Sequence, residues 1–374
     1  TQLRKVRLIA ALPAILNALQ IAVPTAFLGA VLGEYLGSIT AGVGPTLIRL
    51  QGQLDSAGVW SVFLLCAVFA LAAYGLFGLV IKLVTPWVAG ATVQLAVAAD
   101  AAAQARLRAE RRRALRKTVL RSLGNAGITI VVLLLLWQAV VSLTGISPYI
   151  AKGPVDVWEF LVASANAEAN RAQLFPLVGQ TLVDSSLGFV VGMIVAIVLA
   201  VAFSLSKAIE AGVMPLVLLL RTIPLVSIAP VIILMTGRGT TASVAVIGTI
   251  VVLFPALANV LFGLSRASRQ SLDVVHVFGG GRLMALRKVN MPGALPSIFA
   301  AARVSVPGAV TGALLAEWLS TGAGIGGSIL KFNAQAQFAQ LWSSIALITI
   351  ITLLLYNLVQ IVENIVLTRM GMSR

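Results

Sequence analysis

Few residues in this chain of 374 could carry out chemistry. It has a single histidine, His276, and a single cysteine, Cys66. One histidine leaves no set of side chains for a histidine-built zinc or haem site, or for a Ser-His-Asp triad. One cysteine allows no internal disulfide. The remaining candidates are isolated charges inside apolar runs and short glycine-rich segments, which favour binding or transport over catalysis.

Two carboxylates occupy matching positions beside glycine-rich segments. Glu34 and Glu317 each precede an aromatic residue and a loop, and the second loop contains Gly324 and Gly326. The two carboxylates either form an outer gate or accept hydrogen bonds from the backbone amides of these loops, and we favour the structural role. Acid and base catalysis by the pair finds no support, because no nucleophile or metal ligand lies near them in the sequence.

A third candidate is a cation inside an apolar segment. Residues 211–237 contain Arg221, Thr222 and Ser227 together with three prolines. A charge at membrane depth is costly and marks a functional site by default. Two interpretations of Arg221 stay open: it lines a solute pathway and meets an anion, or it binds carbonyls freed near Pro224 or reaches the interface. Thr222 and Ser227 could line the same pathway.

The elements that must position these residues are membrane helices. Apolar residues make up 59% of the chain and charged residues 10%, with a mean hydropathy of +1.01. This composition excludes a soluble enzyme and a disordered protein. Runs of about 20 apolar residues recur, each long enough to cross a bilayer as a helix. The fold class is therefore all-α and polytopic, with expected spans at about 13–36, 58–86, 124–145, 183–206, 211–236, 240–264, 294–319 and 340–368.

The charges orient these spans. The chain has 27 Lys and Arg residues against 12 Asp and Glu, a net charge of +15. Most of the cations fall on one set of alternating loops, so the positive-inside rule places both ends of this chain and the segment 88–123 in the cytoplasm. The loop 146–182 then faces outward. For the Ala- and Arg-rich segment 88–123 we favour contact with anionic membrane lipid over a nucleic-acid or partner site.

The chain also contains an internal repeat. Residues 1–36 align without gaps to residues 284–319, with 17 identical positions of 36, and Glu34 aligns with Glu317. After a shift of one residue, Gly42-Val43-Gly44 matches Gly324-Ile325-Gly326 and Trp60 matches Trp342. Six helices separate equivalent points, so the two copies run in parallel, as around a two-fold axis along the membrane normal.

The copies are unequal in length. Four further spans precede the repeated segment in the second copy and none precede it in the first. We therefore expect residues 1–87 to be the last two transmembrane helices of a first unit, 88–123 a basic cytoplasmic linker, and 124–374 a complete six-helix unit. A portion of about 150 to 200 residues of the first unit is then missing upstream, or the first unit is a two-helix remnant; we favour the former because half a unit leaves small-residue helix faces without partners.

One cytoplasmic loop, 271–292, carries a recognisable spacing. Asp273-Val274-Val275 is followed by three residues, then Gly279, then nine residues, then Val289-Asn290-Met291-Pro292. This resembles the loop of permease subunits of binding-protein-dependent ATP-binding-cassette importers, which has Glu-Ala-Ala, three residues, Gly, nine residues and Ile-x-Leu-Pro. The residues here are conservative variants at the same spacing.

The resemblance implies a type I importer transmembrane domain in which this loop is the coupling helix that docks on an ATPase subunit. Its apolar side chains would fill a groove in the partner, flanked by cations; the alternative is an ordinary amphipathic loop on the lipid surface. The tail of the loop recurs at the start of the chain, which favours docking. The expected coupling residues are Asp273, Val274, Val275, His276, Val277, Phe278, Gly279, Gly280 and Arg282, with Arg4 and Lys5 from the first copy.

The chain lacks a G-x-x-x-x-G-K-[ST] run, so we expect ATP and Mg²⁺ to bind a separate dimer of ATPase subunits, and no cofactor, metal or catalytic residue in this chain. The resemblance further implies an extracytoplasmic substrate-binding protein and a place in the bacterial inner membrane.

Segments 219–230 and 306–327 look most like the nitrate, sulfonate, taurine and thiamine-precursor branch of this family, with the two halves fused. The expected solute is a small anion of the nitrate, sulfonate or taurine kind, or a heterocycle of the thiamine-precursor kind. The alternative is a gradient-driven secondary transporter or channel, which is disfavoured because the spans hold few carboxylates and no histidine suited to proton relay.

Overall fold

The computed structural model describes residues 41–53, 55–84, 130–143, 145–222 and 225–370, with scattered helical residues between 16 and 34. Arg4, Lys5 and the segment 88–123 lie outside these residues, so the predictions made for them are not addressed. In the described part of the chain all regular structure is helical, which confirms the all-α fold class.

The helices follow one another with short connections. An unlabelled helix covers Ile130–Leu143. The labelled elements, of which the η segments are single π-helical turns, are α2 (Val43–Gly52), α3 (Ser56–Val84), α5 (Pro154–Trp158), η3 (Glu159–Ala163), α6 (Ala167–Leu205), α7 (Lys207–Thr222), α8 (Leu225–Thr236), α9 (Thr241–Ser265), α10 (Arg269–Val277), α11 (Arg282–Ala285), η4 (Leu286–Asn290), α12 (Met291–Ala316), η5 (Glu317–Thr321), α13 (Gly324–Ala334) and α14 (Phe338–Arg369).

Five helical stretches are long and apolar enough to cross a membrane: Ser56–Val80, Ala167–Leu205, Thr241–Ser265, Arg282–Thr321 and Phe338–Arg369. Each overlaps one of the expected spans, and together they make the chain a multi-pass membrane protein. The expected span 13–36 falls largely outside the described residues. The described part of the span expected at 124–145 is the shorter apolar helix Ile130–Leu143.

The described residues of the span expected at 211–236 belong to two helices. Helix α7 is described up to Thr222 and α8 from Leu225, and residues 223–224 between them lie outside the described residues. Pro215 and Pro230 lie inside α7 and α8 without ending them.

The prediction that 146–182 is entirely an outer loop is wrong in its second half. Helix α6 begins at Ala167, well before the apolar run. The polar residues of its first turns bind the π-helical turn η3: Asn170 Nδ2 donates to the Phe160 carbonyl at 2.8 Å and Arg171 Nη1 to the Leu161 carbonyl at 2.7 Å. These polar side chains therefore serve helix contacts, although in sequence they are typical of a loop.

The core of the molecule is the crossing of α6, α9 and α12. A Cβ atom added to Gly188 of α6 would lie 2.8 Å from the Cα atom of Gly248 on α9, and one added to Gly312 of α12 would lie 3.0 Å from that same atom. Small residues let helix backbones approach this closely in membrane proteins. Around the crossing pack buried apolar side chains such as Phe203 and Leu257.

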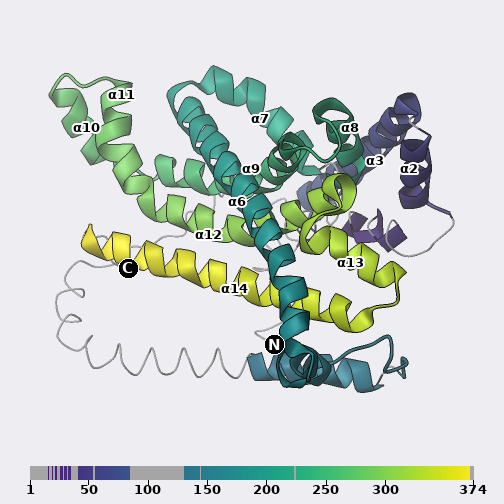
Figure 1. The fold of residues 1–374 in the computed structure, drawn as a ribbon. Helices are drawn as coiled ribbons and strands as arrows, with labels where there is room; N and C mark the ends of the chain where they lie inside the picture. Colours follow the sequence, from purple (N-terminus) through teal and green to yellow (C-terminus); the bar gives the residue numbers. More distant parts are fainter. Residues whose placement is uncertain are drawn as a thin grey trace, which may run out of the picture.

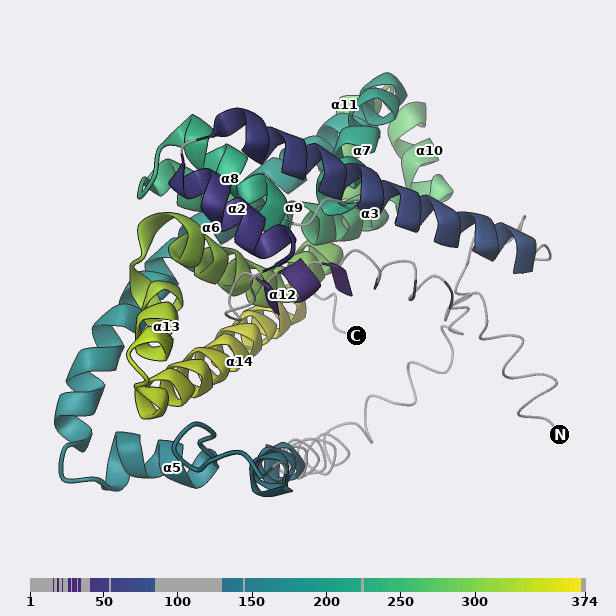
Figure 2. The ribbon, with the colours of Figure 1, turned by 90° about the vertical axis from the view of Figure 1, so that its right-hand side faces the viewer.

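The described helices place two groups of segments at opposite ends of the fold. In Figure 1, α10, α11 and the C-terminal end of α14 lie toward one end, while α13 and α2 lie toward the other. Figure 2 shows α2 and α3 beside α8 at one edge and α5 at the opposite edge, with α13 and α14 between them. Helix α12 runs from the first end toward the second.

Candidate functional site

The predicted docking loop contains a short capped helix, α10. Its N-terminus is capped by Ser268, whose side chain accepts a hydrogen bond from the Ser271 N–H at 3.2 Å. Such caps satisfy amide groups that have no partner within the helix. The helix therefore begins where the sequence supplies a serine, directly after α9 ends.

The end of α10 is set by the glycines that the sequence singled out. Gly279 has a φ of +75°, its N–H donates to the His276 carbonyl at 2.9 Å, and the N–H of Gly280 donates to the Val275 carbonyl at 2.8 Å. These two bonds form a Schellman motif, in which a residue of left-handed conformation closes the helix. A side chain at Gly280 would meet Val275 and Met284, so the chain turns back tightly onto α11.

Helix α10 has no buried residue. The side chains of Val277 and Phe278 are each 83% exposed, and that of Val274 is 56% exposed. Asp273 and His276 are exposed as well, and Val275 is half-buried. Exposed aromatic and aliphatic side chains grouped on a protruding segment are typical of an interaction surface.

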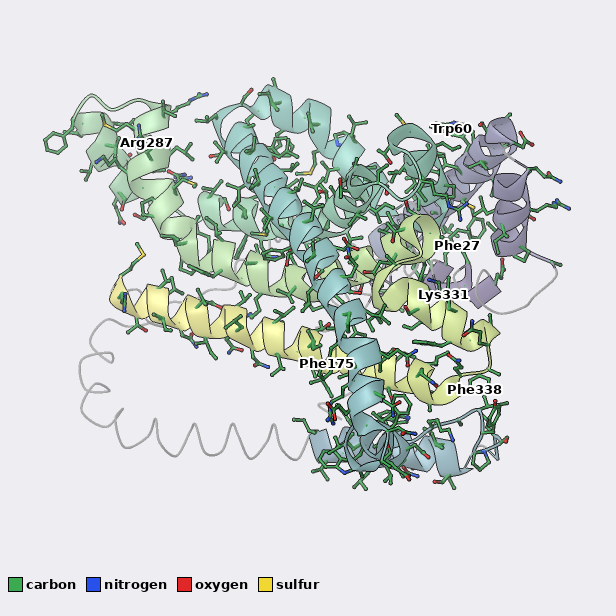
Figure 3. All side chains as sticks on the ribbon, viewed as in Figure 1. Phe27, Trp60, Phe175, Arg287, Lys331 and Phe338 are labelled. Carbon is green, nitrogen blue, oxygen red and sulfur yellow. The ribbon has the colours of Figure 1, made fainter. Side chains whose placement is uncertain are left out.

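The segment after this turn leads directly into the membrane core. Arg282 to Thr321 form one uninterrupted helical stretch, through α11, η4, α12 and η5. Near its start, Asn290 Nδ2 donates to the Leu264 carbonyl at 3.0 Å, which ties it to the end of α9. Arg282, Arg287 and Lys288 are exposed beside α10, and Figure 3 shows Arg287 at this end, far from Lys331 and Phe338.

At the other end, Glu317 connects three elements. It is fully buried, and its Oε2 atom accepts hydrogen bonds from the Gly326 N–H at 2.7 Å and from the Thr181 hydroxyl at 3.0 Å. Thr181 Oγ1 in turn accepts from the Ile325 N–H at 2.9 Å. Gly324 has a φ of +58°, and a Cβ atom there would run into the Glu317 carboxylate. One carboxylate therefore holds the first turn of α13 against α6 and η5.

The first copy repeats this contact. Glu34 Oε2 accepts a hydrogen bond from the Gly44 N–H at 3.1 Å, and Gly44 is the counterpart of Gly326. Gly42, the counterpart of Gly324, has a φ of +136° and also leaves no room for a Cβ beside the carboxylate. The same residue types thus make the same carboxylate-to-amide contact at the start of α2 and of α13.

The structure describes only the backbone of the three candidate pathway residues, on α7 and α8. Arg221 and Thr222 end α7 and Ser227 lies in the first turn of α8, but their side chains lie outside what the structure describes. A cavity of about 270 Å³ lies between α3 and the α8–α9 connection, and its polar lining comes from Asp55, Ser56 and Arg238.

Sequence reasoning missed two interactions between helices: the hydrogen bond of Thr181 with Glu317 and an ion pair between α12 and α14. Thr181 was not singled out because it lies 136 residues from Glu317 in the chain. The second is the ion pair between Arg303 of α12 and Glu363 of α14, whose atoms Nη1 and Oε2 lie 3.2 Å apart. A cation and an acid in two different apolar spans are a signal that could have suggested this pairing.

Residues 188–372 match the family model described as "Binding-protein-dependent transport system inner membrane component". A probable ABC transporter permease protein of Haemophilus influenzae is 30% identical over 225 residues, which cover 60% of this chain and 89% of the relative.

Two further relatives carry solute names. The riboflavin transport system permease protein of Chloroflexus aurantiacus is 28% identical over 242 residues, 64% of this chain and 87% of its own length. The formylaminopyrimidine transport permease protein of Halalkalibacterium halodurans is 24% identical over 235 residues, 63% of this chain and 91% of its own length. In each case nearly a whole relative corresponds to under two thirds of this chain.

Proposed function

Because the chain belongs to the family of inner-membrane components of binding-protein-dependent transport systems, we propose that it forms the solute path of an importer driven by separate ATPase subunits. Members of this family are transport components, so the chain is a permease and not itself an enzyme. The observation that carries the proposal is α10, a capped helix that exposes Val277 and Phe278 beside three cations.

The proposed partner of α10 is the ATPase dimer, which would bind ATP and Mg²⁺. The apolar side chains of α10 suit a groove in that partner, and Arg282, Arg287 and Lys288 suit acidic groups at its rim. The continuous stretch from Arg282 to Thr321 gives the motion of the motor a rigid path into the membrane. The charge distribution supports a cytoplasmic position for α10 and for both ends of this chain, with α13 and the substrate-binding protein on the outer side.

The first 87 residues are proposed to belong to a first unit that pairs with the unit at 124–374. Helix α3 aligns with α14 through Trp60 and Trp342, yet α3 packs on α8 of the other copy, where Val59 and Phe63 contact Val231. A helix that contacts the other copy is what two units facing each other across a shared pathway require. The cavity lined by Asp55 and Arg238 lies at this contact.

The proposed solute is a small anion of the nitrate, sulfonate or taurine kind, or a small heterocycle of the thiamine-precursor kind. Relatives named for riboflavin and formylaminopyrimidine support a heterocycle, and relatives named for taurine and aliphatic sulfonates support an anion. Arg221, Thr222 and Ser227 remain the proposed pathway residues. Glu317 and Glu34 are proposed to hold α13 and α2 as the walls of an outer gate, on the strength of the amide contacts that both copies make.

The test is co-purification of the permease with a candidate ATPase subunit, using wild type and the double variant Val277→Asp/Phe278→Asp. Both side chains are 83% exposed, so their replacement leaves the fold intact. We expect the variant to lose at least nine tenths of the bound ATPase and of solute uptake. Gln270→Ala, also exposed on α10, is the matched control and should bind as wild type.

A second outcome would favour a different driving force. If neither wild type nor variant binds an ATPase, and proteoliposomes that contain only this chain move solute down an ion gradient, the chain is a gradient-driven transporter. ATP-dependent uptake that survives Val277→Asp/Phe278→Asp would instead show that α10 is not the docking site.

A further inference from the structure

A buried ion pair joins the two longest membrane helices of the C-terminal half. Arg303 Nη1 lies 3.2 Å from Glu363 Oε2, and the side chains are 17% and 3% exposed. The guanidinium carbon of Arg303 also lies 5.7 Å from the centre of the Tyr356 ring, on the same helix as Glu363. In the part of the chain that the structure describes, the other ion pair is Lys207–Glu210 on the surface.

The position of Arg303 relates the pair to the docking segment. Arg303 lies on α12, within the uninterrupted stretch that begins at Arg282, directly after the turn that ends α10. Glu363 lies near the end of α14, the last helix of the chain. The pair therefore connects the helical stretch that begins beside α10 to the last helix of the chain.

The first copy lacks both charges. At the alignment that matches Glu34 with Glu317, the counterpart of Arg303 is Gln20, and at the alignment that matches Trp60 with Trp342, the counterpart of Glu363 is Ile81. Tyr74 remains at the position of Tyr356. A lone charge buried in a membrane is costly, so a copy that loses one partner is expected to lose the other. The second copy thus has both charges and the first copy has neither.

We infer that Arg303 and Glu363 are a positioning pair that makes α12 and α14 move as one body with the docking segment, in the second half of the molecule only. This rests on the proposed coupling to an ATPase. The two halves then respond unequally to ATP, because α14 follows the motor through an ion pair and its counterpart α3 does not. Neither side chain needs to touch the solute for this role.

The experiment compares uptake per ATP hydrolysed in proteoliposomes that hold the full-length permease with its ATPase and loaded binding protein. The variants are Arg303→Gln, Glu363→Ile and the double variant Arg303→Gln/Glu363→Ile, which reproduces the neutral pair of the first copy. The single variants each remove one charge of this ion pair and keep the other buried, and they are expected to lower the amount of folded protein. The double variant removes both charges and is expected to fold as wild type does.

The double variant separates positioning from stability. We expect it to keep ATPase binding and ATP hydrolysis within twofold of wild type, while uptake per ATP falls at least tenfold. Asn357→Ala, at an exposed position of α14, is the matched control and should leave uptake per ATP unchanged. If the double variant transports with the wild-type ratio, the pair is merely structural and the inference is wrong. If wild type itself binds no ATPase, the proposed function fails, which is a separate result.

Discussion

At the scale of single residues, the buried carboxylate of Glu317 holds the first turn of α13. One oxygen atom accepts two hydrogen bonds, from an amide of α13 and a hydroxyl of α6. A buried amide that loses its acceptor costs about 1–3 kcal/mol. Asp184, one turn after Thr181 on α6, is also buried and interacts electrostatically with Glu317. The polar cluster is thus compact and sensitive to small changes.

Replacing Glu317 tests this role. Glu317→Leu leaves the Gly326 N–H without an acceptor and is expected to destabilise the protein by about 1–3 kcal/mol. Glu317→Gln keeps an acceptor oxygen and should lose less than half as much. Thermal unfolding in detergent, with limited proteolysis between α12 and α14, measures both effects. Equal losses for the two variants would show that the hydrogen bond to Gly326 does not hold α13.

At the scale of helices, the crossing of α6, α9 and α12 depends on glycines. At Gly188 an added methyl group meets the backbone of Gly248, which cannot move without separating the helices. By contrast, Gly179, also on α6, has nothing within 4 Å of an added Cβ atom. The same substitution on the same helix should therefore have opposite effects at the two positions.

We expect Gly188→Ala to destabilise the protein by about 1–3 kcal/mol, the usual cost of overpacking. Gly179→Ala should be neutral or stabilising by up to about 1 kcal/mol, because alanine favours helix more than glycine does. Fluorescence-detected thermal unfolding of the purified variants compares them directly. A loss at Gly179 as large as that at Gly188 would mean that helix crossing is not the cause.

The elements that could be predicted from sequence are those that local residues determine. The turn after α10 was predicted from Gly279 to Gly281, because a left-handed residue and a helix end are local properties. The start of α6 was missed, because Asn170 and Arg171 look like loop residues until their acceptors on η3 are known. The contact of Thr181 with Glu317 could not be predicted, because it depends on how the helices cross. For Arg303 and Glu363 the sequence offers a signal, two opposite charges in apolar spans, but the distance between them also depends on the crossing.

At the scale of the whole molecule, the charge distribution predicts the orientation of every described segment. Cys66 is buried and is the single cysteine of the chain. A Cys66→Ala variant therefore has no thiol and can serve as the background for labelling. Single cysteines can then be placed at exposed positions at the two ends: Ala165 between η3 and α6, Gln270 on α10, and Thr368 on α14. The positive-inside rule puts Ala165 outside and the other two inside.

A membrane-impermeant maleimide should therefore label Ala165→Cys in intact spheroplasts and label Gln270→Cys and Thr368→Cys only after permeabilisation. If Gln270→Cys and Thr368→Cys are both labelled without permeabilisation, the orientation of the chain is the reverse of the predicted one. Helix α10 would then lie outside, where a cytoplasmic ATPase cannot bind it. If Gln270→Cys alone is labelled without permeabilisation, α10 and the end of α14 lie on opposite sides of the membrane. That result would contradict the fold, in which both lie toward the same end (Figure 1). The labelling pattern thus tests the topology on which the coupling role of α10, and the role of the Arg303–Glu363 pair behind it, both depend.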